Sequence, residues 1–290
     1  LYSSGAADNS IREVEWRSSK LHPGRTFTLA PPQKGGRMDT MDNPGFVGGL
    51  ALSPDARVLY AAQVYGKAVA AVDVETGSVL ARTALEAEAY AAAVPPSGRA
   101  VYVSVWGASR VAVLEPRTLR PLAEIAVGEH PNAMAFSKDE KRLFVACANT
   151  NAVWVVDLES RKAVERIGVA LSPQAPPGST PNALALSPDG ATLLVANADN
   201  NTVAVVDVTR PGESRFEGFI PTGWYPTGVA FDPEGKRILV LSGKGLAGAS
   251  NPRGPTPVAP NADQQYIAGL LNGALSVLDT PDAKALAAMT

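Results

Sequence analysis

Apolar and polar positions follow a phrase that recurs along the chain. A turn such as LSPDA (Leu52 to Ala56) is followed by an apolar run, VLYAA from Val58, and then by a second run, VAAVD, that ends on the acidic residue Asp73. The runs are rich in Val, Leu and Ala and are bounded by Pro, Gly, Asn and Asp, which is the pattern of short strands and turns. The phrase therefore predicts β-strands joined by tight turns.

The spacing inside the phrase is constant. In five copies the apolar residue that anchors the first run lies 14 residues before the acid that ends the second: Leu1 to Glu15, Leu59 to Asp73, Val101 to Glu115, Leu143 to Asp157 and Leu193 to Asp207. A sixth copy, Ile238 to Asp279, spans 41 residues and so contains 27 extra ones. Six copies are visible, and the first is entered in mid-repeat.

The repeat determines the fold that we expect. A unit of about 42 residues has room for roughly four short strands, and the chain shows no helical periodicity before residue 280, so an all-β radial propeller of four-stranded blades fits best. We interpret 1–290 as one propeller domain with these parts: 1–50 as a partial blade and inserted loop, 51–92, 93–134, 135–182 and 183–226 as blades, and 227–290 as a blade with the long inserted loop 244–271.

The insertions point to one face of the expected propeller. The additions near 31–45 and 172–180 lie between the last strand of one blade and the first of the next, and that at 244–271 lies between a second and a third strand. Both kinds of connection emerge on the same face when a blade runs from its inner to its outer strand. Long loops in compact domains are usually functional or disordered, so this face is the predicted binding surface.

Aromatic and amide side chains should gather on that face. They would suit a small polar ligand or a partner loop, and the candidate ligand-binding residues are Trp106, His130, Asn132, Asn182, Trp224 and Tyr225. A purely structural role competes with each: Asn132 and Asn182 can hold their loops, His130 can cap a loop, and the Trp–Tyr pair can pack between blades. Asn149, Asn151, Asn200 and Asn201 read as turn residues, because asparagine tolerates left-handed backbone.

Composition narrows the chemistry. A single cysteine, Cys147, and two histidines, His22 and His130, leave no set for a His/Cys metal centre, and a net charge of −2 disfavours nucleic acid as the main partner. No apolar stretch has the roughly 20 residues of a membrane-spanning helix. The repeated acids, such as Asp73, are expected to accept backbone N–H bonds in turns. Asp39 and Asp42 do not have calcium-loop spacing. We expect no catalytic residue, no metal site and no cofactor.

Several phrases resemble a known family. LLVANADNNTVAVVD (Leu193 to Asp207), FVACANTNAVWVVD (Phe144 to Asp157) and the openings HPNAMAFS and TPNALALS resemble the YVTN-type bacterial propeller repeat. GFIPTGWYPTGVAFDPEGKR (Gly218 to Arg237) and GKGLAGASNPRGP (Gly243 to Pro255) look like bacterial proteins in which a seven-bladed propeller precedes an alkaline-phosphatase-like phosphoesterase domain. The resemblance implies a larger, bacterial, periplasmic or extracellular protein, of which this chain is the propeller part. No phosphoesterase motif and no signal peptide are visible.

These observations favour a non-catalytic scaffold or binding propeller. Its partner would be a phosphoesterase domain of the same polypeptide, another protein or a small polar ligand. Two alternatives stay open: a hydrolase of the propeller lactonase type, which would place acids, His and Arg around a central channel, and a surface or homo-oligomeric interaction protein.

Overall fold

The fold is all-β, as the repeat predicted, and is that of a β-propeller. The computed structural model describes residues 1–5, 9–29, 46–247 and 271–290. The inserted segment 31–45, with Asp39 and Asp42, and most of 244–271 lie outside the described residues. The chain divides into two compact units, one of residues 1–150 and 154–164 and one of residues 151–153 and 165–290.

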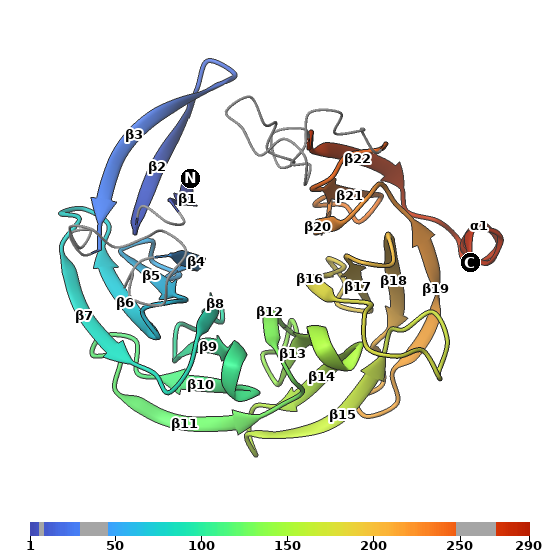
Figure 1. The fold of residues 1–290 in the computed structure, drawn as a ribbon, viewed down its shortest axis with the longest axis horizontal. Helices are drawn as coiled ribbons and strands as arrows, with labels where there is room; N and C mark the ends of the chain where they lie inside the picture. Colours follow the sequence, from blue (N-terminus) through green and yellow to red (C-terminus); the bar gives the residue numbers. More distant parts are fainter. Residues whose placement is uncertain (6–8, 30–45, 248–270) are drawn as a thin grey trace, which may run out of the picture. The chain divides into compact units, whose positions relative to one another are not determined.

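Six antiparallel sheets follow one another along the chain, drawn in Figure 1. The first three contain, in their spatial order, β1 (Tyr2–Ser4), β2 (Ser10–Arg17) and β3 (Lys20–Thr28); β4 (Val47–Leu52), β5 (Val58–Gln63), β6 (Ala68–Asp73) and β7 (Val79–Ala84); and β8 (Ala89–Ala93), β9 (Val101–Val105), β10 (Arg110–Leu114) and β11 (Pro121–Ala126). A short 3-10 turn, η1 (Trp106–Ala108), joins β9 to β10.

The next three sheets repeat this order. They contain β12 (Pro131–Phe136), β13 (Arg142–Cys147), β14 (Ala152–Asp157) and β15 (Lys162–Gly168); β16 (Pro181–Leu186), β17 (Thr192–Asn197), β18 (Thr202–Asp207) and β19 (Arg215–Pro221); and β20 (Pro226–Phe231), β21 (Arg237–Ser242) and β22 (Ala274–Asp279). The turn η2 (Ala148–Thr150) joins β13 to β14, and one α-helix, α1 (Ala283–Met289), follows β22. No helix in the described part of the chain is long and apolar enough to cross a membrane.

Each sheet has two edges with different connections. Antiparallel pairing places the start of the first strand opposite the end of the second, as for Pro131 with Cys147 and Pro181 with Asn197. We call this end of a sheet the loop edge, because it carries the second-to-third-strand connection and the entry into the first strand. The opposite end, with the first-to-second and third-to-fourth connections, is called the turn edge.

Continuous apolar strands arise because successive sheets pack on each other. In β5, Leu59 belongs to a buried cluster with Ile11 of β2, whereas its neighbour Tyr60 belongs to another with Val101 of β9. Alternate side chains of a middle strand thus enter two different cores, which removes the apolar–polar alternation of a half-exposed strand. In the second unit, Val203 of β18 and Ile238 of β21 share a third core.

The turn edge of the second, fourth and fifth sheets is built from the same side-chain hydrogen bond. The Ser53 hydroxyl donates to the Asp55 carboxylate at 2.6 Å and accepts the Val58 N–H at 2.9 Å. Ser137 with Asp139 repeats the hydroxyl–carboxylate bond at 2.6 Å, and Ser187 with Asp189 repeats it again. These short-range bonds hold the SPD-type turns that the sequence predicted.

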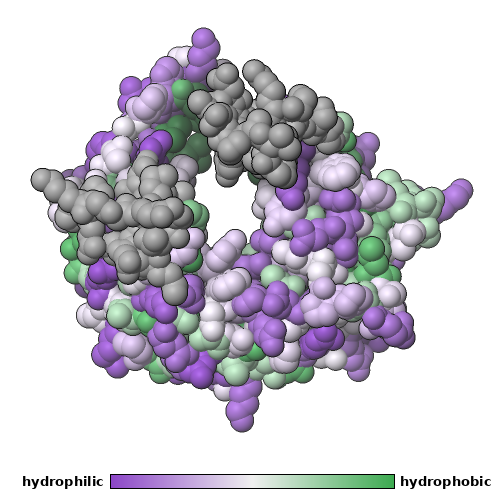
Figure 2. Space-filling model, in the orientation of Figure 1, coloured by the Kyte–Doolittle hydropathy of each residue, from purple (hydrophilic) through white to green (hydrophobic). Residues whose placement is uncertain are grey.

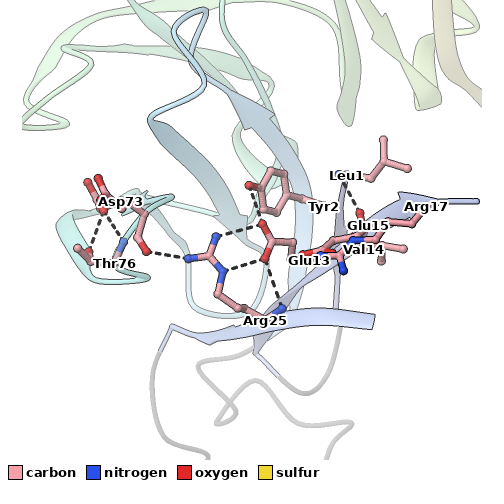
Figure 3. A network of polar contacts seen from close by, with 10 residues as sticks. Leu1, Tyr2, Glu13, Val14, Glu15, Arg17, Arg25, Asp73 and Thr76 are labelled. Atoms are coloured by element: carbon pink, nitrogen blue, oxygen red, sulfur yellow. Dashed lines mark hydrogen bonds and ion pairs between the residues drawn. The ribbon is translucent and has the colours of Figure 1, made fainter. Parts of the chain in front are cut away.

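An arginine joins the first two sheets at this edge. Arg25 of β3 donates from Nε and Nη2 to the Glu13 carboxylate at 2.8 and 3.0 Å, and from Nη1 to the Glu75 carbonyl at 2.7 Å (Figure 3). The Asp73 carboxylate closes that same turn by accepting the Thr76 N–H and hydroxyl. The bidentate bond from Arg25 lowers the pKa of Glu13 to about 2.

Candidate functional site

The loop edge of five sheets has one recurring backbone contact. The residue just before the first strand accepts, through its carbonyl, the N–H of the residue just after the second strand. We call the acceptors junction residues, and the N–H donor with its acceptor is, in chain order, Val64 with Phe46 (2.9 Å), Trp106 with Glu88 (2.7 Å), Ala148 with His130 (3.1 Å), Ala198 with Thr180 (3.0 Å) and Gly243 with Tyr225 (2.9 Å).

Four junction residues have an unusual backbone. The φ angles of Phe46, His130, Thr180 and Tyr225 are 89°, 52°, 49° and 57°. Non-glycine residues seldom adopt positive φ, and a residue before proline, as His130, Thr180 and Tyr225 are, normally prefers extended backbone. Such strain costs about 1–3 kcal/mol per residue and is often found at functional sites. At these four junctions the surrounding fold therefore keeps the backbone in a strained conformation.

In the first unit, each junction side chain contacts a side chain from a second-to-third-strand connection. The rings of Phe46 and Tyr65 lie 5.4 Å apart and tilted by 57°. Glu88 forms an ion pair with Lys67 at 3.6 Å.

His130 contributes the third such contact, to Trp106. The two rings are stacked with their centroids 3.7 Å apart and their planes 8° from parallel. Trp106 begins η1, so its ring is positioned directly where β9 ends, and both rings are half-buried. The structure thus brings these two predicted residues together as an aromatic pair. Among the described residues, no group of three His, Cys, Asp or Glu side chains is arranged to hold a metal ion.

Asparagines organise the inserted loop 172–180 of the second unit. The Asn151 amide donates to the Pro176 carbonyl at 2.8 Å, and its oxygen accepts the N–H groups of Gly178 and Ser179 at 2.9 and 2.8 Å. Asn200 donates to the Ser179 hydroxyl at 2.8 Å. Asn151 has the left-handed backbone expected of a turn residue, with a φ of 46°. The side chains of Asn151 and Asn200, however, bond to a loop 21–28 residues away and not to their own turns.

The junction after this loop is polar, and the last one is aromatic. The Thr180 hydroxyl donates to the Asp199 carboxylate. The Lys244 ammonium lies over the Tyr225 ring, 4.1 Å from its centroid, and the Tyr225 N–H donates to the Asn201 side chain at 2.8 Å.

Trp224 is held next to that aromatic junction. Its N–H donates to the Gly245 carbonyl at 2.7 Å, and its carbonyl accepts the Lys244 N–H at 3.1 Å. The backbone is therefore fixed on both sides, while the indole is 53% exposed. The result is a large aromatic side chain on a rigid frame beside a cation–π pair.

The two predicted asparagines lie one residue inside their strands. Asn132 is 3% exposed, and its side-chain oxygen accepts the Ala133 N–H at 2.6 Å. The side-chain oxygen of Asn182 is buried without a hydrogen-bond partner within the described part of the chain. A buried acceptor normally has a partner, so the Asn182 oxygen can accept a hydrogen bond from an added donor such as water or a ligand.

The repeated acids bond within turns, and the cysteine is buried in a strand. Asp207 accepts the Thr209 N–H at 2.9 Å and hydroxyl at 2.6 Å, which lowers the pKa of its carboxyl to about 2. Bonds from Ser160 lower the pKa of Asp157 in the same way. Burial raises the pKa of the Cys147 thiol to about 12, so this cysteine is protonated at neutral pH and is a poor nucleophile.

Sequence reasoning missed the partners of the junction residues. Tyr65, Asp199 and Lys244 each lie 19 residues after their junction residue, and that constant spacing was the available signal. Glu88 and His130 instead pair with Lys67 and Trp106, which precede them in the chain. Spacing alone does not show whether a junction residue pairs with a residue before it or after it in the chain, because spacing gives no side-chain orientation.

Comparisons with known proteins agree on the fold. The family model described as "Lactonase, 7-bladed beta-propeller" matches residues 71–176, and no curated protein matches the chain. A solved structure, Kuenenia stuttgartiensis hydrazine synthase, is 13% identical with a TM-score of 0.54 and covers 94% of this chain and 90% of that one. The chain is therefore a β-propeller protein, and its residues 71–176 are similar to a seven-bladed propeller family.

Proposed function

We propose that this chain is a non-catalytic propeller that binds a partner domain, or a small polar ligand, at the loop edge of its sheets. The observation that carries the proposal is the junction frame. One backbone hydrogen bond recurs five times, yet its side chains make aromatic, ionic, stacked, hydroxyl–carboxylate and cation–π contacts. A constant frame with variable side chains suits recognition better than catalysis.

The chemistry available at the loop edge supports binding. His130 is stacked on Trp106, and general base catalysis would require it to lie within hydrogen-bonding reach of a nucleophile. An interface hot spot is often an aromatic anchor beside a charged group. The exposed Trp224, next to Tyr225 and Lys244, matches this composition. Such a site gains affinity because the backbone that carries the tryptophan is already held in place before binding.

The sixth sheet supports a protein partner. Leu241, Leu275 and Val277 are 51–57% exposed. The corresponding residues of the fifth sheet, Ala196, Val203 and Val205, are buried. By analogy with the YVTN-type and propeller–phosphoesterase proteins that the sequence resembles, we propose as partner a phosphoesterase domain of the same bacterial protein, in the periplasm or outside the cell.

The intact native protein tests this setting. We expect a mass well above the 30.1 kDa of this chain and hydrolysis of p-nitrophenyl phosphate that is lost on metal chelation. A native mass near 30.1 kDa without that activity contradicts the phosphoesterase partner.

The role of Trp224 in binding the partner domain is tested by substituting one exposed tryptophan at a time with alanine. In the native protein, Trp224→Ala should weaken the attachment of the partner domain and speed proteolytic separation of the two parts severalfold. Trp16→Ala is the matched control, because Trp16 is 64% exposed and lies on β2, away from any junction. Equal proteolysis of the two variants would refute a binding role for Trp224.

A lactonase-type hydrolase is the second candidate. It is favoured by the family match over 71–176, a range that contains both Trp106 and His130. This alternative predicts that the purified chain hydrolyses a small lactone and that His130→Ala reduces the rate at least tenfold. The non-catalytic proposal predicts no hydrolysis above the uncatalysed rate for either form.

A further inference from the structure

A cavity of about 410 Å3 lies on the turn edge of the second unit, away from the junction residues. Its apolar wall includes Leu194 of β17, Phe231 of β20, Ile238 of β21 and Leu286 of α1. The helix lies beside β19 in Figure 1 and forms a mostly apolar projection in Figure 2. It is anchored there, because the Thr290 hydroxyl accepts the Phe219 N–H at 2.9 Å.

The same place in the first unit is occupied by a tyrosine. A smaller cavity of about 290 Å3 lies between the second and third sheets. Its residues Val58, Tyr60, Val94, Pro116 and Arg117 hold the repeat positions that Thr192, Leu194, Phe231, Thr280 and Pro281 hold at the larger cavity. The buried Tyr60 ring packs against the next sheet, and its hydroxyl donates to the Pro116 carbonyl at 3.0 Å.

Aromatic side chains are the rule at this position. Tyr102 and Phe144 take it in the next two repeats, and both are buried. The fifth and sixth sheets have Leu194 and Leu239 instead, which lack a ring and a hydroxyl. Of these two, Leu194 lines the cavity. Comparison with Tyr60 shows what the larger cavity lacks: a planar apolar ring with a hydrogen-bond donor at its far end.

We propose that this cavity binds a small phenol. Its ring takes the place of the missing tyrosine ring against Leu194, Phe231 and Ile238, and its hydroxyl donates to the Thr280 carbonyl, the counterpart of the Pro116 carbonyl. The volume is within the roughly 300–1,000 Å3 of ligand sites. The apolar wall faces polar groups of Thr192, Arg215, Glu217 and Thr280. Burying the ring also requires that its hydroxyl find an acceptor.

The charges at the rim favour a neutral ligand. Arg215 lines the cavity, but its guanidinium pairs with the Asp207 carboxylate at 3.0 Å. Glu217 adds a negative charge nearby. An anionic ligand would have to displace Asp207 from Arg215, whereas a neutral phenol leaves this pair intact. The site is independent of the proposed function, because none of its residues belongs to the loop edge.

The probe is p-cresol, which is the tyrosine side chain without its backbone. We expect p-cresol to bind the full chain at one saturable site, detected by ligand-observed NMR. Toluene should bind about threefold to tenfold more weakly, because it cannot make the hydrogen bond. Equal affinity for the two molecules would refute the role of the Thr280 carbonyl.

Substitutions at the aromatic position make the test specific. Leu194→Tyr and Leu194→Phe should fill the cavity, raise the melting temperature and reduce p-cresol affinity at least tenfold. Leu171→Tyr is the matched control, because Leu171 is exposed and does not line the cavity; it should bind as the parent does. Conversely, Tyr60→Leu should create a second p-cresol site in the first unit.

Three results would overturn the proposal. They are the absence of saturable p-cresol binding to the unmodified chain, unchanged binding in both position-194 variants, and unchanged stoichiometry in a folded Tyr60→Leu protein. The Tyr60→Leu arm does not depend on the folding of the position-194 variants, because it changes the other compact unit.

Discussion

The two edges of the sheets treat the internal repeat differently. At the turn edge of three sheets, side chains repeat along with the backbone: Ser53 pairs with Asp55 as Ser137 pairs with Asp139 and Ser187 with Asp189. At the loop edge, only the backbone bond repeats. Stacking of His130 on Trp106 between the third and fourth sheets is replaced by Lys244 over Tyr225 within the sixth. The difference teaches that the turn edge uses repeated side chains to form its turns, whereas the loop edge keeps one main-chain bond and varies its side-chain contacts from sheet to sheet.

The largest expected difference between the edges concerns two tyrosines. Tyr102→Ala removes a buried ring near the turn edge that packs on Phe136 with 5.2 Å between ring centroids, and should cost about 3–5 kcal/mol of unfolding free energy. Tyr65→Ala, at the loop edge, removes a ring that is 36% exposed and should cost about 1 kcal/mol or less. Urea unfolding of both variants measures this, and similar losses would remove the distinction.

A smaller difference in unfolding free energy is expected between substitutions of Asp207 at the turn edge and Asp199 at the loop edge. Asp207→Ala deletes the acceptor of the Thr209 N–H and hydroxyl and the partner of Arg215, and should cost about 1–2 kcal/mol. Asp199→Ala, which removes the exposed partner of Thr180 at the loop edge, should change stability by about 0.5 kcal/mol or less. A larger loss from Asp199→Ala in the same urea experiment would reverse our ranking of the edges.

The smallest expected effect is the acid sensitivity of the turn edge. The pKa of Glu13, lowered to about 2 by Arg25, is below its value in the unfolded chain, so its contribution is complete above the unfolded pKa and is lost as the pH falls through the folded one. Thermal melts from pH 7 to pH 2 should show stability falling below about pH 4.5. Glu13→Gln should be less stable at neutral pH but should lose less on acidification, and parallel pH profiles for the two proteins would contradict this assignment.

The sequence was sufficient for features that depend on the main chain. Constant spacing predicted the strands, so that the apolar run from Val58 is β5, and turn chemistry predicted that Asp157 and Asn151 would bond to backbone groups. The Asp157 turn is local, because its partner Ser160 lies three residues away. The Asn151 side chain bonds instead to a loop 25–28 residues away, which turn chemistry alone does not identify.

The site itself was predicted only in part. Trp106 and His130 were both named, but their stacking depends on a side-chain direction that periodicity does not contain. The role of Lys244 escaped for the same reason. The positive φ of Tyr225 escaped because a residue before proline normally prefers extended backbone. The cavity beside Leu194 depends on a difference between repeats, which becomes meaningful only when the structure shows what Tyr60 does at the corresponding place.

Hydrogen–deuterium exchange tests the central claim most directly, by comparing the isolated chain with the native protein that carries its partner. We predict that the partner slows exchange at the loop edge, above all at Trp224, Tyr225 and the segment from Gly243 to Gly245, and leaves the SPD-type turns at Ser53 and Ser137 unchanged. Protection confined to those turns, with the junction segments exchanging as fast as in the isolated chain, would contradict the account.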